Sequence, residues 1–250
     1  MGQAGIGEAH GFTAMEILAQ AAPQPVPDAR RTTHDTDGLP TGRMWALPVA
    51  EYLGLRPQFI DSTMLGGSSF IAHLMPAMLA LESGQCNAVL VCYGSTQKTG
   101  SFSRKGMTEA FKLVDPLPYE HPYSPMLPPT AYALAASRHM YEFGTTREQL
   151  AEVAVAARRW AQLNPEAYMR DPLSIDDVLN ARMISTPLTV RDCCLVTDGA
   201  GAFVLMRADR AKAQKQKPVY VLGNATAVWN RQISSMENLT VTSASESGQR

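Results

Sequence analysis

The 250-residue chain has few cysteines and an almost balanced charge. Its four cysteines are too few for the disulfide framework of a secreted domain, so we expect free thiols in a reducing cytoplasm. Only 18% of the residues are charged, and 22 Lys and Arg oppose 23 Asp and Glu, for a net charge of −1. This balance provides no summed positive field for a phosphate backbone, which argues against nucleic acid as a partner.

Long apolar runs are also missing. No stretch reaches the length of a bilayer span, and no basic segment followed by an apolar one opens the chain. We therefore expect a soluble, unsecreted, cytoplasmic protein without a membrane partner. Hydrophobic residues make up 45% of the chain, a composition that excludes disorder, collagen and coiled coil. The length fits one large α/β domain.

A βαβ unit is the clearest pattern in the first hundred residues. A short extended stretch ends at Ile60, and apolar residues from 71 to 81 then recur at helical spacing. Ser68 or Ser69 is expected to cap this helix, and Pro76 to kink it. Gly84 ends the helix, and residues 88–92 form a continuous apolar run typical of a strand buried on both faces.

The rest of the chain is predicted from local start and stop signals. Expected helices span 14–22, 129–142, a segment from Thr145-Thr146 to Asn164, a short piece opened by Ser174 with Asp177, and a basic stretch after Met206. Expected loops span 23–43 and, as a surface excursion, 94–130. Asp198-Gly199 is expected to turn into a strand over 202–206, and Val219 to Leu222 to form one more buried strand.

The turn from Gly66 to Ser69 is the strongest candidate for chemistry. A helix N-terminus offers unpaired N–H groups, and glycine lets a ligand approach them closely, so the turn could stabilise an oxyanion. The competing interpretation, favoured from these four residues alone, is tight strand-to-helix packing. His73 lies one helical turn past Ser69 and is a weak candidate base, because no nucleophile elbow surrounds either serine.

Metal and redox roles have little support in the sequence. Cys86 and Cys92 flank or lie in the buried strand and are expected to pack as apolar residues. Cys193 and Cys194 form a vicinal pair rather than a spaced CxxC, so core packing is favoured there too. We predict no metal site.

Several ordered segments resemble the thiolase superfamily, specifically the sterol-carrier-protein-type, lipid-transfer-like thiolases. Residues 61–70 through Gly84 to residues 93–97 resemble that family's nucleophile helix and the strand after it. Residues 130–132 with 141–151 are similar to its loop-domain helices, and residues 187–202 to its return into the core sheet. The resemblance covers roughly residues 45 to 250.

The resemblance implies a layered αβαβα thiolase fold that includes the first half, the loop domain and the start of the second half. The implied domains are residues 1–99 for the first part of the N-terminal half, 100–190 for the loop domain, 191–213 for the return, and 214–250 for the beginning of a truncated C-terminal half. Such proteins are usually dimers. The chain is accordingly expected to be a partial product.

One departure bears on mechanism. In the family a cysteine at the start of the helix takes an acyl group from coenzyme A. Counting back from Gly84, that position falls on Gly67, which carries no thiol. Relatives without the cysteine resemble carbon–carbon lyases, or thiolases that work with an oligonucleotide-binding-like, zinc-containing partner subunit.

The resemblance implies an acyl-CoA acyltransferase or an enzyme that cleaves a C–C bond beside a CoA thioester carbonyl. The CoA thioester is then a substrate, and no permanently bound cofactor is expected. The alternative is a noncatalytic acyl-CoA or lipid-binding or assembly subunit. The expected site residues are Gly66, Gly67, Ser68, Ser69 and His73 around the acyl group, and Arg104, Lys105 and Arg147 as phosphate contacts.

Overall fold

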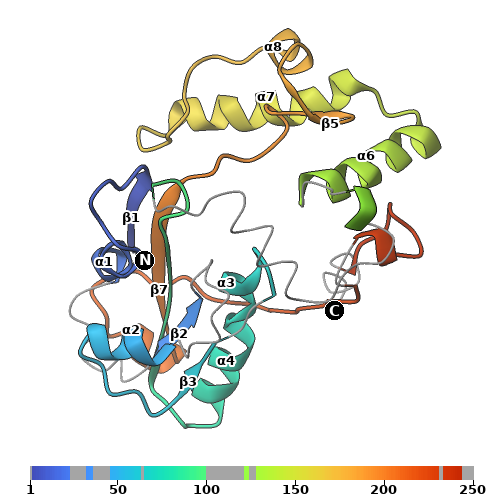
Figure 1. The fold of residues 1–250 in the computed structure, drawn as a ribbon. Helices are drawn as coiled ribbons and strands as arrows, with labels where there is room; N and C mark the ends of the chain where they lie inside the picture. Colours follow the sequence, from blue (N-terminus) through green and yellow to red (C-terminus); the bar gives the residue numbers. More distant parts are fainter. Residues whose placement is uncertain are drawn as a thin grey trace. The chain divides into compact units, whose positions relative to one another are not determined.

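The chain forms two compact units in the computed structural model, which describes residues 2–22, 32–35, 46–62, 65–99, 121–123, 128–230 and 233–243. The first unit comprises residues 1–112 and 196–226, and the second comprises residues 113–195 and 227–250. The first is built on a five-stranded sheet, and the second is mainly helical (Figure 1). The four domain ranges expected from the sequence stay a prediction.

The sheet of the first unit has the strand order β1-β7-β4-β2-β3. Strands β2, β3 and β4 run parallel, whereas β7 pairs antiparallel with β4 and with β1. The βαβ prediction is confirmed, because β3 and β4 both lie parallel to β2 and the predicted helical segment connects them. The bounds are β1 Gly2–Gly7, β2 Thr32–Asp35, β3 Ile60–Asp61, β4 Ala88–Ser95 and β7 Asp198–Met206.

Strand β2 corrects the prediction that residues 23–43 are loop. Thr32 pairs with Leu90 of β4 on one side and with Ile60 of β3 on the other. The short sequence of β2 is polar and lacks the alternation of hydrophobic and polar residues that would predict a strand. It is a strand because two neighbouring strands supply partners for its backbone groups. The other residues of the 23–43 segment lie outside the described residues.

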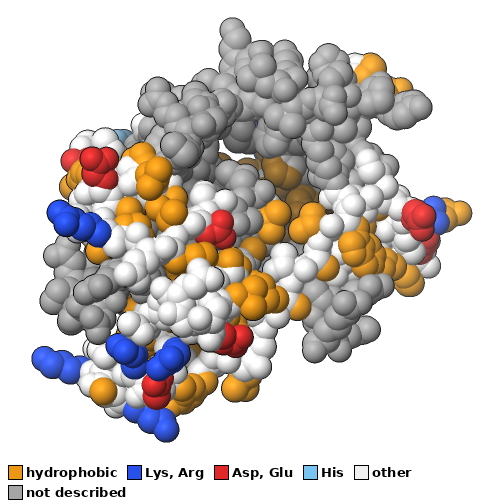
Figure 2. Space-filling model, turned by 90° about the horizontal axis from the view of Figure 1, so that it is seen from below, with side chains coloured by type: hydrophobic (Ala, Val, Ile, Leu, Met, Phe, Trp, Pro, Cys, Tyr) orange, Lys and Arg blue, Asp and Glu red, His pale blue; other side chains and the backbone are white. Residues whose placement is uncertain are grey.

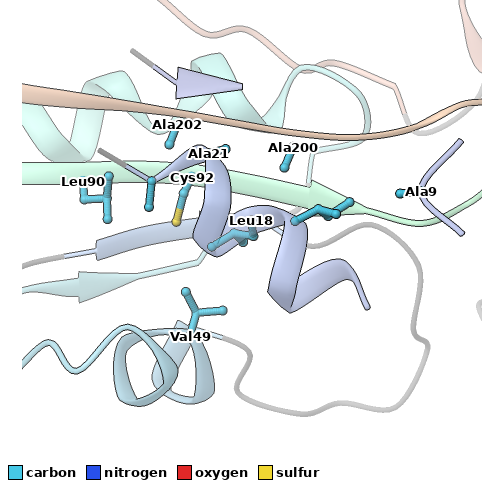
Figure 3. Packing of buried hydrophobic residues seen from close by; sticks show 10 residues of the cluster. Ala9, Leu18, Ala21, Val49, Leu90, Cys92, Ala200 and Ala202 are labelled. Carbon is cyan, nitrogen blue, oxygen red and sulfur yellow. The ribbon is translucent and has the colours of Figure 1, made fainter. Parts of the chain in front are cut away.

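Helices α1 (Ala14–Ala21) and α2 (Ala46–Tyr52) contribute to the hydrophobic core on one face of this sheet (Figure 3). The predicted helix at 14–22 is confirmed, and Thr13 caps it. Gly94 of β4 allows α1 to approach closely, because a Cβ there would lie 2.6 Å from the carbonyl oxygen of Ala14. The core residues on this face are Ala9, Ile17, Leu18, Ala21, Ala22, Val49, Leu90, Cys92, Ala200 and Ala202.

A second hydrophobic cluster joins residues of α3 (Ser69–Ala72) and α4 (Leu74–Glu82) to the sheet. The Phe70 and Phe203 rings pack edge to face at 4.9 Å between centroids. The sequence predicts a single helix with a kink at Pro76. The structure instead has two helices, α3 and α4, which meet at His73, three residues before that proline. Because a proline ring clashes with the carbonyl four residues earlier, the break falls next to Ala72 and Pro76 lies in the first turn of α4.

Strand β7 begins at Asp198, so the predicted Asp198-Gly199 turn is wrong. Gly199 pairs with Ser95 and Asp198 with Gly7. After β7, the predicted basic helix is the single short turn α9 (Ala208–Ala211).

The predicted strand from Val219 to Leu222 is also wrong. Val219 is 91% exposed and Leu222 is 97% exposed. This segment has high β-propensity, but it has no strand partner among the described residues, and both sides of β7 are already taken by β1 and β4.

The second unit confirms the predicted helices. Helix α6 ends at Gly144 in a left-handed conformation, with φ 66°, and Thr146 with Gln149 forms the capping box of α7. Ser174 with Asp177 forms the capping box of α8, which packs against α7 through Val178. The elements are the 3-10 turn η1 His121–Tyr123, α6 Pro129–Phe143, α7 Arg147–Leu163, α8 Ile175–Leu179, the hairpin β5 Met183–Ser185 and β6 Leu188–Thr189, and the 3-10 turn η2 Ile233–Ser235.

On the face drawn in Figure 2, most of the visible Lys and Arg side chains lie in the left and lower-left part of the view, and Asp and Glu side chains lie among them and elsewhere. Within the described ranges, no helix combines the length and the hydropathy that a membrane span needs.

Candidate functional site

The turn before α3 is held by the side chain of Ser69. Its hydroxyl accepts a hydrogen bond from the Leu65 N–H at 2.7 Å and donates one to the Gly66 carbonyl at 2.7 Å. Ser69 is fully buried, and its own N–H donates to the Gly66 carbonyl at 3.0 Å. Of the two serines predicted to cap the helix, Ser68 occupies the N-cap position of α3 but makes no side-chain cap hydrogen bond, whereas the Ser69 hydroxyl closes the preceding turn.

The backbone from Gly66 to Ser68 faces solvent. Gly66 has φ +81°, a conformation that favours glycine, whereas Gly67 has no such constraint. A Cβ added at Gly67 would meet no atom within 4 Å. The position that matches the family's nucleophile is thus open, and a ligand atom can approach the peptide groups on either side of it.

His73 is buried at the junction of α3 and α4. Its side chain is fully buried, and among the described residues neither ring nitrogen has a hydrogen-bond partner. Burial lowers the pKa of His73, and the nearby Asp61 carboxylate opposes that shift. Since the Ser69 hydroxyl bonds to Gly66, the structure does not bring Ser69 and His73 together as a nucleophile and its base.

Arg147 forms an ion pair with Asp192. Its guanidinium donates to both carboxylate oxygens of Asp192, at 2.9 Å and 3.3 Å. Asp192 also accepts from the Thr189 N–H and hydroxyl. Burial by itself would raise the pKa of Asp192, but these hydrogen bonds outweigh it and hold the pKa below its ordinary value. The other two expected phosphate contacts, Arg104 and Lys105, lie outside the described residues.

A cavity in the second unit gathers three arginines that sequence reasoning missed. It has a volume of about 350 Å³, within the usual range for small-ligand pockets. Arg158, from α7, donates to the Asp171 carbonyl at 2.6 Å. Arg182 and Arg191 form no ion pair with a carboxylate of the described residues. The lining residues are Arg158, Met169, Asp171, Pro172, Leu173, Asp177, Ala181, Arg182, Val190 and Arg191.

No single sequence signal could have identified this cavity. Its arginines are spread over 34 positions of chain, and only the folded second unit brings them into the lining of one cavity. In the part of the chain that the structure describes, no group of three or more His, Cys, Asp or Glu is placed to hold a metal ion.

Comparisons with known proteins identify relatives over most of the chain. The 17-hydroxy-3-oxo-4-pregnene-20-carboxyl-CoA lyase of Mycobacterium tuberculosis is 30% identical over 220 residues, which is 84% of this chain and 57% of the lyase. The acetyl-CoA acetyltransferase of Methanothermobacter thermautotrophicus is 30% identical over 245 residues, 90% of this chain and 60% of that enzyme. Sterol carrier protein 2 of Gallus gallus is 32% identical over 90 residues, 36% of this chain and 16% of that protein. No family model matches.

A solved structure decides the fold. The Ltp2-ChsH2(DUF35) aldolase superposes with a TM-score of 0.76 at 22% identity, covering 96% of this chain and 63% of that one. The chain is a thiolase-superfamily homologue. Its thiolase-like α/β fold and its likeness to sterol-carrier-protein-type thiolases are confirmed.

This thiolase homologue spans less than two thirds of the first two curated relatives, 57% and 60% of their lengths. In the homologue, the turn over Gly66 to Ser68 belongs to the first unit and the arginine cavity to the second.

Proposed function

We propose that this chain is part of a thiolase-like enzyme that makes or breaks a C–C bond beside a CoA thioester carbonyl. The observation that carries the proposal is the solvent-facing backbone from Gly66 to Ser68, held in shape by the buried Ser69 hydroxyl. The relatives support the reaction class, since their names describe a CoA lyase and an acetyl-CoA acetyltransferase.

The turn contributes backbone N–H groups to the reaction. When a bond beside a thioester carbonyl breaks, the electron pair moves onto the carbonyl oxygen as an enolate. Preorganised N–H donors stabilise that oxygen more in the transition state than in the ground state. Because Ser69 fixes Leu65 and Gly66 through two hydrogen bonds of 2.7 Å, the peptide groups that follow need little reorganisation.

The absence of a thiol at Gly67 favours a reaction in which the C–C bond is cleaved or formed without a covalent acyl-enzyme intermediate. A covalent thioester at this position needs a thiol, and glycine has none. An aldol-type cleavage needs only a base for the hydroxyl proton and a donor for the enolate oxygen. His73 stays a predicted base. Among the described residues its buried ring nitrogens have no hydrogen-bond partner, and the Asp61 carboxylate favours its protonated form.

The arginine cavity is proposed to hold the phosphates of coenzyme A. Guanidinium groups bind phosphate oxygens with two parallel hydrogen bonds. Arg182 and Arg191 line the cavity without an ion pair to a carboxylate of the described residues, although Arg191 is near enough to Asp177 to lower the pKa of that carboxyl. Leu173, Met169 and Val190 add apolar surface beside them. Arg104 and Lys105 remain proposed contacts as well, whereas Arg147 would first have to leave Asp192.

Calorimetry with acetyl-CoA and turnover of a panel of CoA thioesters test the proposal. We expect the double variant Arg182→Ala with Arg191→Ala to weaken CoA binding at least tenfold, and Arg159→Ala, on the exposed surface, to leave it unchanged. Ser69→Ala should lower turnover more than binding. Unchanged affinity in the double variant would place the phosphates elsewhere, and no turnover of any thioester, with partner present, would contradict the enzyme proposal.

A noncatalytic acyl-CoA or lipid-binding or assembly subunit is the second candidate, and Gly67 favours it. It predicts CoA binding without turnover under all conditions. A homodimer and an oligonucleotide-binding-like, zinc-containing partner are proposed for either function. The solved relative carries the double name Ltp2-ChsH2(DUF35) aldolase, which supports the proposal of a partner subunit. The cytoplasmic location stays a prediction.

A further inference from the structure

The four free cysteines fall into two contrasting pairs. Cys86 and Cys92 are buried in the first unit, at 2% and 0% exposure. Cys193 is half-buried and Cys194 is exposed, and the two are adjacent in the chain. The sequence expectation that all four pack in the core therefore fails for Cys194. Two adjacent thiols of which one is exposed form a different kind of group from two buried thiols that are six positions apart.

The segment before the vicinal pair is fixed. Asp192 accepts hydrogen bonds from Arg147 and Thr189, and its N–H donates to the Thr189 carbonyl at 3.1 Å. Cys193 follows this anchor directly, and strand β7 begins four residues after Cys194. The pair therefore lies in the short connection between Asp192 and strand β7, and the two thiols are near each other because their residues are adjacent in the chain.

We propose that Cys193 and Cys194 are a redox-sensitive vicinal dithiol that a peroxide converts into an intrachain disulfide. The exposed Cys194 sulfur attacks one peroxide oxygen, giving a sulfenic acid and releasing water from hydrogen peroxide. The Cys193 sulfur then attacks the Cys194 sulfur, the S–O bond breaks and a second water leaves. In total, two thiols and one H₂O₂ give one disulfide and two H₂O.

The surroundings of the two cysteines determine which thiol reacts with the peroxide and which thiol then forms the disulfide. Burial, with contributions from Asp192 and Cys194, raises the pKa of Cys193, so Cys193 is the weaker first nucleophile. It is well placed as the resolving thiol. Adjacent Cα atoms lie about 3.8 Å apart, closer than the roughly 4.4–6.8 Å of ordinary disulfides, so the product is strained and easily reduced. A labile bond of this type suits reversible regulation.

The test uses the full chain with hydrogen peroxide and peptide mapping. Cleavage after Arg191 and Arg207 releases residues 192–207, which contain no other cysteine. We expect this peptide to lose two hydrogens on oxidation and to regain them with dithiothreitol. Cys193→Ser should instead leave a sulfenic acid on Cys194 that dimedone traps. Cys86→Ser is the matched control and should behave as the unmodified protein. A disulfide between two chains, or a sulfinic acid on Cys194 with Cys193 still reduced, would overturn the proposal.

A second probe does not depend on oxidation. Phenylarsine oxide condenses with two nearby thiols, forming two As–S bonds and releasing one water. We expect one arsenical to bind per chain and to resist competition by excess monothiol. Cys193→Ser and Cys194→Ser should each abolish this resistance, with circular dichroism confirming that both variants are folded. Resistant binding that survives either substitution would show that the two thiols do not act as a pair.

Discussion

Asp198 accepts a hydrogen bond from the Ala9 N–H at 2.8 Å, joining two residues 189 positions apart. The same carboxylate accepts from the N–H groups of Lys98 and Thr99 and, at 2.5 Å, from the Thr99 hydroxyl. It therefore ties the segments after β1 and β4 to the start of β7. Burial would raise the pKa of Asp198, but these hydrogen bonds hold it below its ordinary value.

Replacing Asp198 by Asn should destabilise the protein by about 2–4 kcal/mol, because one carboxylate oxygen becomes an NH₂ group that faces N–H donors. Urea unfolding of the first unit measures this loss. Asp209→Asn is the matched control, since Asp209 lies on the surface beside Arg207 and its replacement should leave stability unchanged. Equal effects of the two substitutions would contradict the role of Asp198 as a link between strands.

Stability should fall steeply in acid. A carboxylate whose folded pKa is lowered contributes stability above its unfolded pKa, about 3.9, and loses it as the pH falls through the folded value. Asp198 and Asp192 both have lowered pKa values. Melting temperatures measured from pH 6 down to pH 2 should therefore drop below about pH 4. Asp198→Asn should show a smaller drop, and an identical pH profile would count against this explanation.

Gly94→Ala should cost about 1–3 kcal/mol, because its Cβ would lie 2.6 Å from the Ala14 carbonyl oxygen and 2.8 Å from the Leu18 Cβ. Helix α1 would have to move away from β4. Gly199→Ala, at a strand position with nothing within 4 Å of the added atom, is the control and should be nearly neutral. Thermal melts of the two variants compare them, and a neutral Gly94→Ala would show that α1 packs less tightly.

Ser69→Ala should lower stability by about 1–2 kcal/mol, since it removes the hydroxyl that accepts from the part-buried Leu65 N–H and leaves a small gap at a fully buried side chain. Hydrogen exchange of the Leu65 amide should accelerate. Ser68→Ala, at the exposed neighbouring position, provides the comparison and should leave that amide unchanged. Protection of Leu65 in both variants would mean that the turn is held by its backbone alone.

Gly67→Cys should fold with its new thiol accessible, because the glycine has no left-handed φ and no atom within 4 Å of the added Cβ. Iodoacetamide labelling followed by mass spectrometry measures the accessibility. The buried Cys92, whose pKa burial raises to about 12, should remain unlabelled in the same experiment. If the introduced thiol reacted as slowly as that of Cys92, the turn would be closed to ligands.

Local signals in the sequence determined many element ends. The capping boxes at Thr146 and Ser174 and the left-handed Gly144 predicted where helices of the second unit begin and end, because a cap needs only residues within one turn. The apolar run at residues 88–92 likewise predicted a strand buried on both faces, and β4 is such a strand.

Only the tertiary structure decided the features that depend on distant partners. The polar residues 32–35 form a strand because β3 and β4 lie on either side, whereas Val219 to Leu222 has strand propensity and no described partner. The sequence Asp198-Gly199 suggests a turn. In the structure the buried Asp198 carboxylate instead accepts hydrogen bonds from Ala9 and Thr99, which lie in two other segments. The three arginines line one cavity only in the folded second unit. A sequence records each residue's propensity, but hydrogen-bond partners and neighbours in space arise from long-range packing.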